Sequence, residues 1–489
     1  MQDIEILSQL FQKYSGLKPA RIAKLSGAGS NRRYYRLLAD DGGTGSSFSC
    51  IGVGGDNLRD CRAFTNLSRV FRSHGLPVPE VYEVSGDGMH YIQQDLGDIS
   101  LFDIIGQKGP DSTEVRELVK ESLAKLVEMQ TVDRNEWERY AEYPAFSKRQ
   151  VMWDLNYFKY EYLKPSGVDC DENLLEDDFE KLAEILTEDG GRYGFMYRDF
   201  QSRNIMVCGG KPFFIDYQGG RPGPLLYDAV SFLWQAKAGF PEEFRHGMIH
   251  YYMEQLNLQG NTSCLQSDPT TADDCRTGLF ALFRTLQVLG AYGLRGLVER
   301  KAHFIESIPL ALANLERLKL DGILDDYPEL KRVAATICTD RRFVKGDEDE
   351  NRLHVKVFSF SYKKGYPSDY TGNGGGFMFD CRGMHNPGRY AEYRELTGLD
   401  APVITFLEER GEVQKFVDNA FAMVSPSVET YLRRGFSDLQ IGFGCTGGRH
   451  RSVYCAEHLA RRLAESYPDA IVEVIHREQG MERIIKYEN

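Results

Sequence analysis

The stretch that decides the fold of the first part of the chain is Tyr197-Arg198-Asp199-Phe-Gln-Ser-Arg-Asn204, followed by Phe214-Ile215-Asp216-Tyr217-Gln218. Phosphoryl transfer asks a protein for positioned metal ions and for a carboxylate beside the attacking hydroxyl. Asp199 and Asn204 lie five residues apart on one predicted loop, and Asp216 ends the strand that follows a Gly-Gly turn. The spacing therefore predicts Asp199 as a catalytic base and Asn204 and Asp216 as ligands of Mg²⁺. Asp and Asn also serve as ordinary turn residues, which is the alternative for each of them alone.

The chain around this stretch divides into a strand-rich part and a helical part. Residues 1–98 alternate short strand-like runs with glycine-rich turns, interrupted by helical periodicity at 2–15 and 58–75. Residues 99–340 are mostly helical by periodicity, with a strand-like insertion at 194–218. We therefore expect an N-terminal lobe over 1–98 and a larger, catalytic and substrate-binding lobe over 99–340.

These motifs resemble the catalytic loop and the metal-binding Asp of the protein-kinase-like superfamily, specifically the aminoglycoside phosphotransferase family. The resemblance implies an α+β bilobal protein-kinase-like domain that uses ATP and Mg²⁺. It also makes Leu25-Ser-Gly-Ala-Gly-Ser-Asn-Arg-Arg-Tyr-Tyr-Arg36 the hairpin over the ATP phosphates, and Gln93-Gln-Asp-Leu-Gly97 the hinge whose backbone receives adenine. The ATP-binding residues implied are Gly27, Gly29, Ser30, Asn31, Arg32, Arg33, Gln94 and Asp95.

One departure from the superfamily concerns the lysine that usually holds the α- and β-phosphates. The matching strand reads Ser47-Phe-Ser-Cys-Ile-Gly-Val-Gly-Gly55 and contains no Lys. The flanking residues resemble the bacterial cell-wall amino-sugar kinases, which also lack it and which phosphorylate the anomeric hydroxyl. We therefore expect Arg32 or Arg33 to supply the missing positive charge. Asp228, after the loop, is expected to be a helix N-cap and a brace for the loop rather than a catalyst.

The acceptor site is predicted on an aromatic helix in the larger lobe, Val151-Met-Trp-Asp-Leu-Asn-Tyr-Phe-Lys-Tyr-Glu-Tyr162. Sugar rings present an apolar face and a rim of hydroxyls, so aromatic side chains next to carboxylates suit them. Trp153, Asp154 and Tyr157 are the predicted sugar-binding residues. The alternative is that the aromatic residues form an ordinary core stripe at helical spacing.

A different pattern begins after a charged segment, which predicts a linker over 341–352. Helical periodicity near 411–433 and 452–467 separates several strand-like runs. Alternation of this kind favours an α/β domain with a largely parallel sheet over residues 353–489. The strands are predicted at 353–362, 376–380, 401–407, 439–444 and 470–476.

A phosphate-binding loop is predicted where the strand at 439–444 leads into Cys445-Thr-Gly-Gly-Arg-His-Arg-Ser452 and then into a helix. Glycines at such a turn let backbone N–H groups converge on an anion at the helix N-terminus. Cys445 and Arg451 also have the C-x5-R-S spacing of cysteine-dependent phosphatases, with Asp380 as the candidate general acid. The loop thus indicates phosphate binding, phosphate hydrolysis or a purely structural turn.

Four separated motifs of this region resemble the C-terminal domain of the RNase adapter protein RapZ. They are Ser359-Phe-Ser-Tyr-Lys-Lys-Gly-Tyr-Pro367, Phe379-Asp-Cys-Arg-Gly-Met-His-Asn-Pro387, Leu396-Thr-Gly398 and the loop at 444–452. The resemblance implies a domain that binds an amino-sugar phosphate. The ligand-site residues it implies are Lys363, Arg382, His385, Asn386, Cys445, Thr446, Gly447, Gly448, Arg449, His450 and Arg451.

The composition fits a soluble chain of several domains. The 489 residues carry a net charge of -13, which disfavours bulk binding to nucleic acid without a local basic patch. The ten scattered cysteines, the absence of a signal peptide and of a long apolar run predict a cytoplasmic protein with no membrane partner. Expected partners are an amino sugar and a phosphosugar; no feature supports an RNA or protein partner.

Three functions stay open at this point. The first is an amino-sugar kinase fused to a phosphosugar-sensing domain. The second is a regulatory adapter whose kinase-like part binds nucleotide without turnover. The third is a bifunctional kinase and cysteine-dependent phosphatase. Both resemblances lead to amino-sugar chemistry, and this agreement favours the first function by analogy.

Overall fold

A computed structural model describes residues 2–25, 32–39, 48–188, 193–259, 269–340, 343, 352–367, 376–409 and 411–485, without the side chains of 2, 269–275 and 302. The chain forms two compact units. The first unit contains residues 1–294 and 307–338, and the second contains 295–306 and 339–489. Among the described residues no helix is long and apolar enough to cross a membrane.

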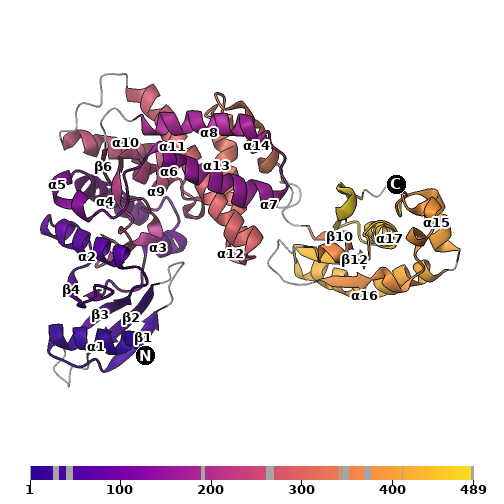
Figure 1. Cartoon of the computed structure of the whole chain (residues 1–489), viewed down its shortest axis with the longest axis horizontal. Helices are drawn as coiled ribbons and strands as arrows, with labels where there is room; N and C mark the ends of the chain where they lie inside the picture. The colour runs from indigo at the N-terminus through magenta and orange to yellow at the C-terminus, as the bar shows by residue number, and fades with distance from the viewer. Residues whose placement is uncertain are drawn as a thin grey trace. The chain divides into compact units, whose positions relative to one another are not determined.

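The first unit begins with a five-stranded antiparallel sheet in the order β1-β2-β3-β5-β4. Helix α1 (Gln2–Ser15) packs against this sheet through Leu7 and Phe11, which meet Tyr35, Leu37 and Ile92 in one buried cluster (Figure 1). Apolar residues at positions 7 and 11 recur at helical spacing, so they share the face that the sheet covers. The strands are β1 (Arg21–Leu25), β2 (Arg33–Leu38), β3 (Ser49–Gly54), β4 (Val81–Val84) and β5 (His90–Gln94).

Helix α2 (Leu58–Ser73) connects β3 to β4. Its N-terminus is capped by Asn57, whose side chain accepts a hydrogen bond from the Arg59 N–H. Close packing to the end of β3 explains the glycines there, because a Cβ at Gly55 would lie 2.2 Å from the Cys61 Sγ.

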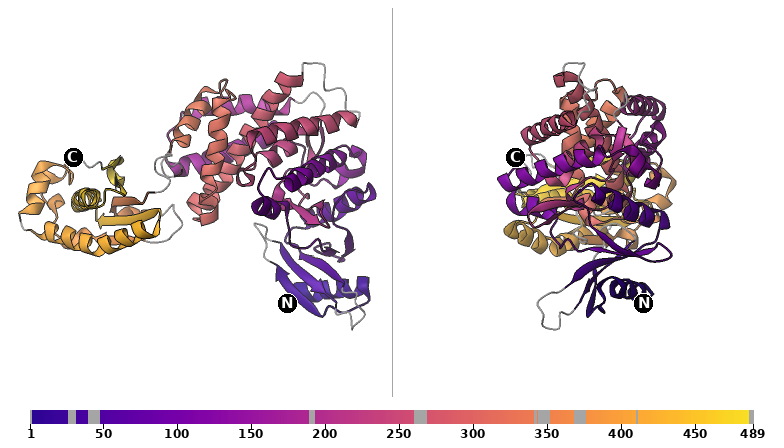
Figure 2. Two further views of the ribbon diagram at one scale, coloured as in Figure 1. Left: turned by 180° about the vertical axis from the view of Figure 1, so that it is seen from behind. Right: turned by 90° about the vertical axis from the view of Figure 1, so that its left-hand side faces the viewer.

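The rest of the first unit is mostly helical, as the periodicity predicts. The magenta and rose helices pack side by side in both views of Figure 2, and α11 contacts α6 and α13. The helices are α3 (Leu101–Lys108), α4 (Thr113–Gln130), α5 (Arg134–Trp137), α6 (Lys148–Phe158), α7 (Lys164–Ser166), α8 (Glu172–Thr187), α9 (Leu226–Leu233), α10 (Glu242–Leu258), α11 (Pro269–Tyr292), α13 (Ile308–Leu320) and α14 (Pro328–Cys338).

Two small antiparallel pairs interrupt these helices in and just after the strand-like insertion predicted at 194–218. Strand β6 (Tyr193–Met196) pairs with β9 (Arg221–Pro224), and β7 (Ile205–Cys208) pairs with β8 (Lys211–Phe214). The loop between β6 and β7 therefore carries the predicted catalytic residues, and the loop after β8 carries Asp216.

The second unit is built on a five-stranded sheet in the order β11-β12-β10-β13-β14. The first four strands run parallel and β14 is antiparallel to β13, which confirms the predicted largely parallel sheet. The strands are β10 (His354–Ser361), β11 (Phe377–Asp380), β12 (Asp438–Cys445), β13 (Ile471–His476) and β14 (Met481–Ile484).

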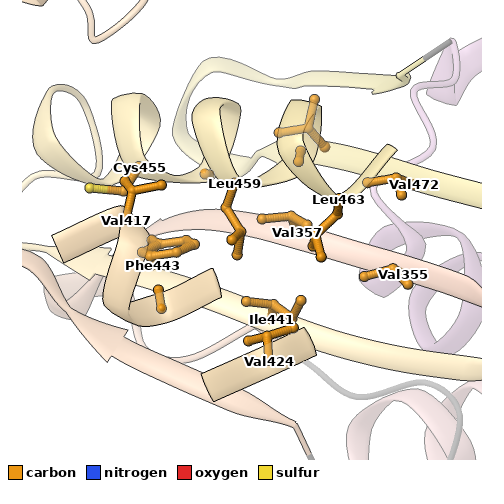
Figure 3. Close-up of a cluster of buried hydrophobic side chains, with 14 of the residues drawn as sticks. Val355, Val357, Val417, Val424, Ile441, Phe443, Cys455, Leu459, Leu463 and Val472 are labelled. Carbon is orange, nitrogen blue, oxygen red and sulfur yellow. The ribbon is translucent and has the colours of Figure 1, made fainter. Parts of the chain in front are cut away.

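Helices α16 (Glu412–Arg434) and α17 (Arg451–Ser466) share one core with this sheet. Figure 3 shows Val355 and Val357 of β10 among side chains that come from both helices. Alternate residues of a strand point to the same face, so this face of the sheet is the one that the helices bury. The short helix α12 (Ala302–Ile305) falls in the chain segment that is grouped with this unit.

The strand predicted at 401–407 is wrong, because these residues form helix α15 (Ala401–Glu408). The β-branched residues in Ala-Pro-Val-Ile-Thr-Phe-Leu favour a strand locally. Pro402 at the start of the helix, however, is compatible with a first helical turn. Val403 and Leu407, four residues apart, are the two buried positions, so burial of a helical stripe outweighs the local preference.

Candidate functional site

The loop that follows β6 is held in place by Asp228 of α9. Its carboxylate accepts hydrogen bonds from the backbone N–H groups of Tyr197 at 2.7 Å and Arg198 at 2.9 Å. Burial raises the pKa of Asp228 to about 7, although these hydrogen bonds and one from Gln130 work against the rise. The prediction that Asp228 caps a helix is wrong, since Leu225 occupies the cap position and Asp228 lies inside the first turn. Its contact with the loop is the predicted brace.

Arg198 has a backbone conformation that non-glycine residues seldom adopt, with φ of 82°. Two contacts keep it there: the N–H bond to Asp228 and an ion pair between its Nη2 and the Asp154 Oδ2 at 2.6 Å. Both members of this pair are buried. A strained backbone conformation of this kind persists where the surrounding structure holds it. It fixes the direction in which the chain continues into the next residue, Asp199.

Asp199, Asn204 and Asp216 are brought together by hydrogen bonds to backbone carbonyls. The Asn204 Nδ2 donates to the Asp199 carbonyl at 2.9 Å, and the Ile215 N–H donates to the Asn204 carbonyl at 3.0 Å. Asp216 follows with φ of 70°, and its Oδ1 accepts a hydrogen bond from Gln218 at 2.7 Å. Within the described part of the chain, the Asp199 carboxylate has no hydrogen-bond or ion-pair partner.

The chemistry of these donors fits Mg²⁺. Carboxylate and amide oxygens are the ligands of hard divalent cations, which use one or two protein carboxylates together with substrate phosphates. Desolvation and the nearby Asp199 carboxylate raise the pKa of Asp216, because its charge has little local compensation in the protein alone. Among the described residues, no group of three or more His, Cys, Asp or Glu could by itself hold a metal ion.

Arg32, one of the two arginines predicted to replace the missing lysine, lies between two acidic side chains. Its Nη2 lies 3.6 Å from Asp60 of α2, and its Nη1 lies 3.9 Å from Asp216. Burial opposes its charge, but the surrounding acidic groups raise the pKa of Arg32 further, so the guanidinium stays protonated. Arg33 instead forms an ion pair with Asp3 in α1, with Nη2 to Oδ1 at 3.0 Å. Arg32 and Arg33, which the sequence does not distinguish, thus have different acidic partners in the structure.

Of the remaining predicted nucleotide residues, Gln94 ends β5 and Asp95 follows it. The Gln94 N–H donates to the Glu80 carbonyl at 2.8 Å. The Asp95 carboxylate accepts a hydrogen bond from Arg36 at 2.7 Å. Burial raises the pKa of Asp95, but this pairing counteracts burial, and the pKa is lowered. Strands β1 and β2 are antiparallel, as a hairpin requires. Gly27, Gly29, Ser30 and Asn31 lie outside the described residues.

The predicted sugar residues on α6 separate into two kinds. Trp153 is 64% exposed and stacks on Tyr157, with ring centroids 5.8 Å apart. Asp154 is buried in its ion pair with Arg198, so its charge is already compensated. Asp154 is therefore the counter-ion of Arg198, whereas Trp153 lies exposed at the surface beside Tyr157.

Sequence reasoning missed Arg221 and Tyr143, which also lie in this region. The Arg221 guanidinium stands over the Tyr143 ring at 4.8 Å, and the Tyr143 hydroxyl donates to Asp60 at 2.7 Å. Asp60 in turn faces Arg32. Arg221 follows Asp216 by five residues, so its nearness to the metal-binding motif was the available signal.

The loop after β12 in the second unit has the geometry of an anion site. Gly448 has φ of 66°, and a Cβ there would lie 2.4 Å from Glu478 and 2.8 Å from the Ser361 N. Only glycine fits this turn. Thr446 and Gly447 are exposed, and a Cβ at Gly447 would meet no atom within 4 Å. The loop therefore packs tightly on one side and opens on the other.

Cys445 and Arg451 stand at the two ends of this loop and are both buried. The Cys445 Sγ accepts from the Gly448 N–H at 3.1 Å and lies 3.1 Å from the Ser452 hydroxyl. Burial would raise the pKa of Cys445, but hydrogen bonds from Ser452, Arg449 and Gly448 outweigh burial and lower it. These hydrogen bonds favour the thiolate form more than the surroundings of an ordinary cysteine do.

Only part of the Arg451 guanidinium is hydrogen-bonded within the described protein. Its Nη1 donates to the carbonyls of Arg382 at 3.0 Å and Met384 at 2.9 Å. Its buried Nε has no partner in the described structure. A buried donor without a partner carries a free-energy cost, which a bound anion would remove.

The other predicted ligand residues have different hydrogen-bond and ion-pair partners. Arg382 is exposed and pairs with Asp380, His385 lies 3.1 Å from the Tyr390 hydroxyl, and the Asn386 side chain accepts from the Gly388 N–H. The backbone N–H of Lys363 donates to the Ser361 hydroxyl. The side chain of Lys363 is exposed at the surface. Arg449 donates to the Glu395 carbonyl, and His450 is bound to the Tyr393 carbonyl.

Comparisons with known protein families agree with this division. Residues 21–260 match the phosphotransferase enzyme family, and residues 353–480 match the RapZ C-terminal domain. The chain joins a phosphotransferase-family region to a RapZ C-terminal region. Both resemblances that the sequence motifs predict are therefore confirmed.

Curated relatives carry the name nucleotide-binding protein. The one from Corynebacterium efficiens is 39% identical over 125 residues, which is 26% of this chain and 38% of the relative. The one from Shewanella denitrificans is 40% identical over 195 residues, which is 37% of this chain and 64% of the relative. The chain thus spans less than two thirds of the length of either relative.

Two solved structures resemble the chain at low sequence identity. An ADP-bound aminoglycoside phosphotransferase, APH(2'')-Ib, is 12% identical and covers 68% of this chain and 97% of its own, with a TM-score of 0.41. Choline kinase from Cryptosporidium parvum is 12% identical and covers 64% of this chain and 93% of its own, with a TM-score of 0.44.

Proposed function

We propose that the first unit is an ATP- and Mg²⁺-dependent kinase that phosphorylates an amino sugar at its anomeric hydroxyl. The observation that carries the proposal is the Asp199 carboxylate, which lies beside Asn204 and Asp216 and has no partner among the described residues. Membership of residues 21–260 in the phosphotransferase family supports the reaction type. The amino sugar follows from the resemblance to the cell-wall sugar kinases.

In the proposed reaction, Asp199 accepts the proton of the acceptor hydroxyl as its oxygen bonds to the γ-phosphorus. The bond from that phosphorus to the β,γ-bridging oxygen breaks, and ADP leaves. Asn204 and Asp216 would hold Mg²⁺, which neutralises charge on the phosphates. Arg32, fixed between Asp60 and Asp216, would contribute a positive charge to the same phosphates.

The direct test is ADP release from Mg²⁺-ATP with N-acetylglucosamine, N-acetylmuramic acid, glucosamine and simple hexoses. We expect ADP that depends on one of the amino sugars and a product that is phosphorylated at C1, which ³¹P-¹H NMR identifies. ATP binding without sugar-dependent ADP from any acceptor would contradict the proposal and favour the regulatory adapter.

Arg32→Ala should raise the KM for ATP about tenfold, because a charge-assisted contact to phosphate contributes roughly 1.5 kcal/mol. The matched control is Arg33→Ala, which removes an arginine paired with Asp3 instead of Asp216. The KM for ATP of both variants is measured in the ADP-release assay. An equal rise in both variants, or no rise in Arg32→Ala, would reject the assignment of Arg32.

For the second unit we propose binding of an amino-sugar phosphate at the loop 445–451, with a regulatory effect on the kinase. The unpartnered Arg451 Nε and the open side of the loop at Gly447 support an anion there. The match to the RapZ C-terminal domain supports the ligand class.

Hydrolysis of the same ester is the second candidate, and the thiolate environment of Cys445 favours it. This chemistry needs a protonated general acid, and Asp380 is the candidate. Its hydrogen bond with Arg382 lowers the pKa of Asp380, which disfavours the protonated carboxyl that a general acid needs. Binding is therefore preferred to hydrolysis.

Arg451→Ala should weaken the binding of glucosamine 6-phosphate roughly 30-fold, because it removes the guanidinium that is buried under the loop. Titration calorimetry on the full chain measures the affinity, and Arg461→Ala, on the same helix but half-exposed, is the control. Cys445→Ser should keep most of the affinity. Release of inorganic phosphate by the wild type that Cys445→Ser abolishes would instead establish the phosphatase.

A further inference from the structure

Two arginines from different elements contact the ring of a single tyrosine, Tyr143. The Arg59 guanidinium of α2 lies 4.7 Å from the centre of the ring, and the Arg221 guanidinium of β9 lies 4.8 Å from it. A guanidinium group over an aromatic face is attracted to it. The ring of Tyr143 therefore joins α2, which follows strand β3 of the five-stranded sheet, to β9, which follows Asp216.

The segment that carries Tyr143 is anchored to β9. The Phe146 N–H donates to the Pro222 carbonyl at 2.8 Å. Phe146 is buried, and its ring contacts those of Tyr227 and Phe283. The backbone of this segment is therefore fixed relative to β9, and the Tyr143 side chain reaches from it to α2.

The hydroxyl of Tyr143 holds an acidic side chain of α2. It donates to the Asp60 Oδ1 at 2.7 Å. Burial and then the Asp60 carboxylate raise the pKa of Tyr143, although Arg59 and Arg221 act in the opposite direction. The hydroxyl therefore keeps its proton and remains a donor to Asp60.

The second oxygen of Asp60 faces Arg32. The Asp60 Oδ2 lies 3.6 Å from the Arg32 Nη2, and the Arg32 Nη1 lies 3.9 Å from Asp216. Both distances exceed those of hydrogen bonds, so the two carboxylates act on this guanidinium mainly through their charges. The place of the Asp60 charge therefore affects the place of the Arg32 charge, and the hydrogen bond from Tyr143 fixes the former.

We infer that Tyr143 is a positioning residue for the binding of ATP. Its hydroxyl holds Asp60, and Asp60 in turn holds the Arg32 guanidinium near Asp216. The inference rests on the proposed function, because it takes Arg32 and Asp216 to face the nucleotide phosphates. Tyr143 acts through Asp60 and Arg32 rather than by contact with a substrate. It lies 83 residues from Asp60 in sequence, so only the folded chain brings the two together.

Tyr143→Phe tests the inference, because it removes the hydroxyl and keeps the ring that both arginines contact. We expect the Kd for Mg²⁺-ATP, measured by calorimetry on the full chain without any sugar, to rise about fivefold. This effect is smaller than the loss expected for Arg32→Ala, since the guanidinium itself remains. In the ADP-release assay the KM for ATP should rise by the same factor, whereas kcat should change less than about twofold.

Tyr140→Phe is the matched control. Tyr140 lies three residues before Tyr143 and also has an arginine over its ring, Arg139 at 4.8 Å. In the part of the chain that the structure describes, its hydroxyl has no hydrogen-bond partner. Loss of this hydroxyl should leave the Kd for Mg²⁺-ATP at the value of the wild type.

A double-mutant cycle distinguishes positioning of Arg32 from a general structural role. If Tyr143 acts through Arg32, Tyr143→Phe should raise the Kd for Mg²⁺-ATP less than about twofold when Arg32→Ala is already present. A further fivefold rise in the double variant would overturn the inference. An unchanged Kd in Tyr143→Phe alone, or in Arg32→Ala alone, would overturn it as well.

The binding measurement also separates this inference from the proposed reaction. If no sugar releases ADP, the kinase proposal fails, but a Kd for Mg²⁺-ATP that rises in Tyr143→Phe and not further in the double variant still supports the inference. If the wild type phosphorylates a sugar and Tyr143→Phe keeps the wild-type Kd and KM for ATP, the kinase proposal stands and the inference is overturned. A wild type that does not bind Mg²⁺-ATP would overturn both.

Discussion

Asp199→Asn should lower kcat about 10³-fold with little change in the KM for ATP. A positioned general base contributes on the order of 10²–10⁴-fold, and the amide cannot accept the proton of the acceptor hydroxyl. Asparagine has the same shape, and the hydrogen bond from Asn204 goes to the backbone carbonyl of residue 199, so the loop should keep its conformation. ADP release gives kcat, and calorimetry with Mg²⁺-ATP checks that the nucleotide still binds.

The matched control for this variant is Asp177→Asn, since Asp177 is exposed on α8 and far from the loop in sequence. It should retain the kcat of the wild type. A kcat for Asp199→Asn within about threefold of the wild type would show that Asp199 is not the base, because a base contributes far more than that.

Asp228→Ala should destabilise the first unit by about 4 kcal/mol and lower kcat about 10²-fold. The Tyr197 and Arg198 amides would lose the carboxylate that accepts their hydrogen bonds, and each buried unsatisfied group costs roughly 1–3 kcal/mol. Arg198 would also lose a contact that holds its left-handed backbone. A displacement of about 1 Å at the reacting group is enough for a 10²-fold loss.

Asp178→Ala is the control that separates stability from catalysis. Asp178 is also buried and accepts from a backbone N–H, that of Leu330, but it joins α8 to α14 instead of bracing the loop. Urea unfolding should show a loss of stability in both variants, whereas kcat should fall only in Asp228→Ala. A normal kcat in Asp228→Ala would contradict the bracing role.

The same carboxyl should make stability depend on pH. The folded-state pKa of Asp228 is about 7, against 3.8 for an ordinary Asp, so the folded protein binds more protons between these values. Its contribution to the free energy of unfolding is therefore greatest below about pH 4, falls as the pH rises, and is constant above about pH 7. The difference in stability between wild type and Asp228→Asn isolates this trend.

Local patterns of the sequence predict much of the architecture. Asp199, Asn204 and Asp216 are close in sequence and share a strand-loop-strand unit, so their spacing alone predicts their meeting. The loop 445–452 is likewise a continuous segment between a strand and a helix. The prediction at 401–407 shows the limit of local reasoning, because the apolar residues there fit a strand until the core selects positions 403 and 407.

The charges of the site, by contrast, were decided by tertiary structure. The carboxylate of Asp154 is suited to binding sugar hydroxyls, but it contacts Arg198, 44 residues away in sequence, and is the counter-ion of that arginine. Arg32 and Arg33 are adjacent and chemically identical, yet one faces Asp60 and Asp216 while the other faces Asp3. Spacing along the chain determines which residues can share a loop or a helix face. Which charge neutralises which depends on distances between segments remote in sequence, and only the packed fold sets those distances.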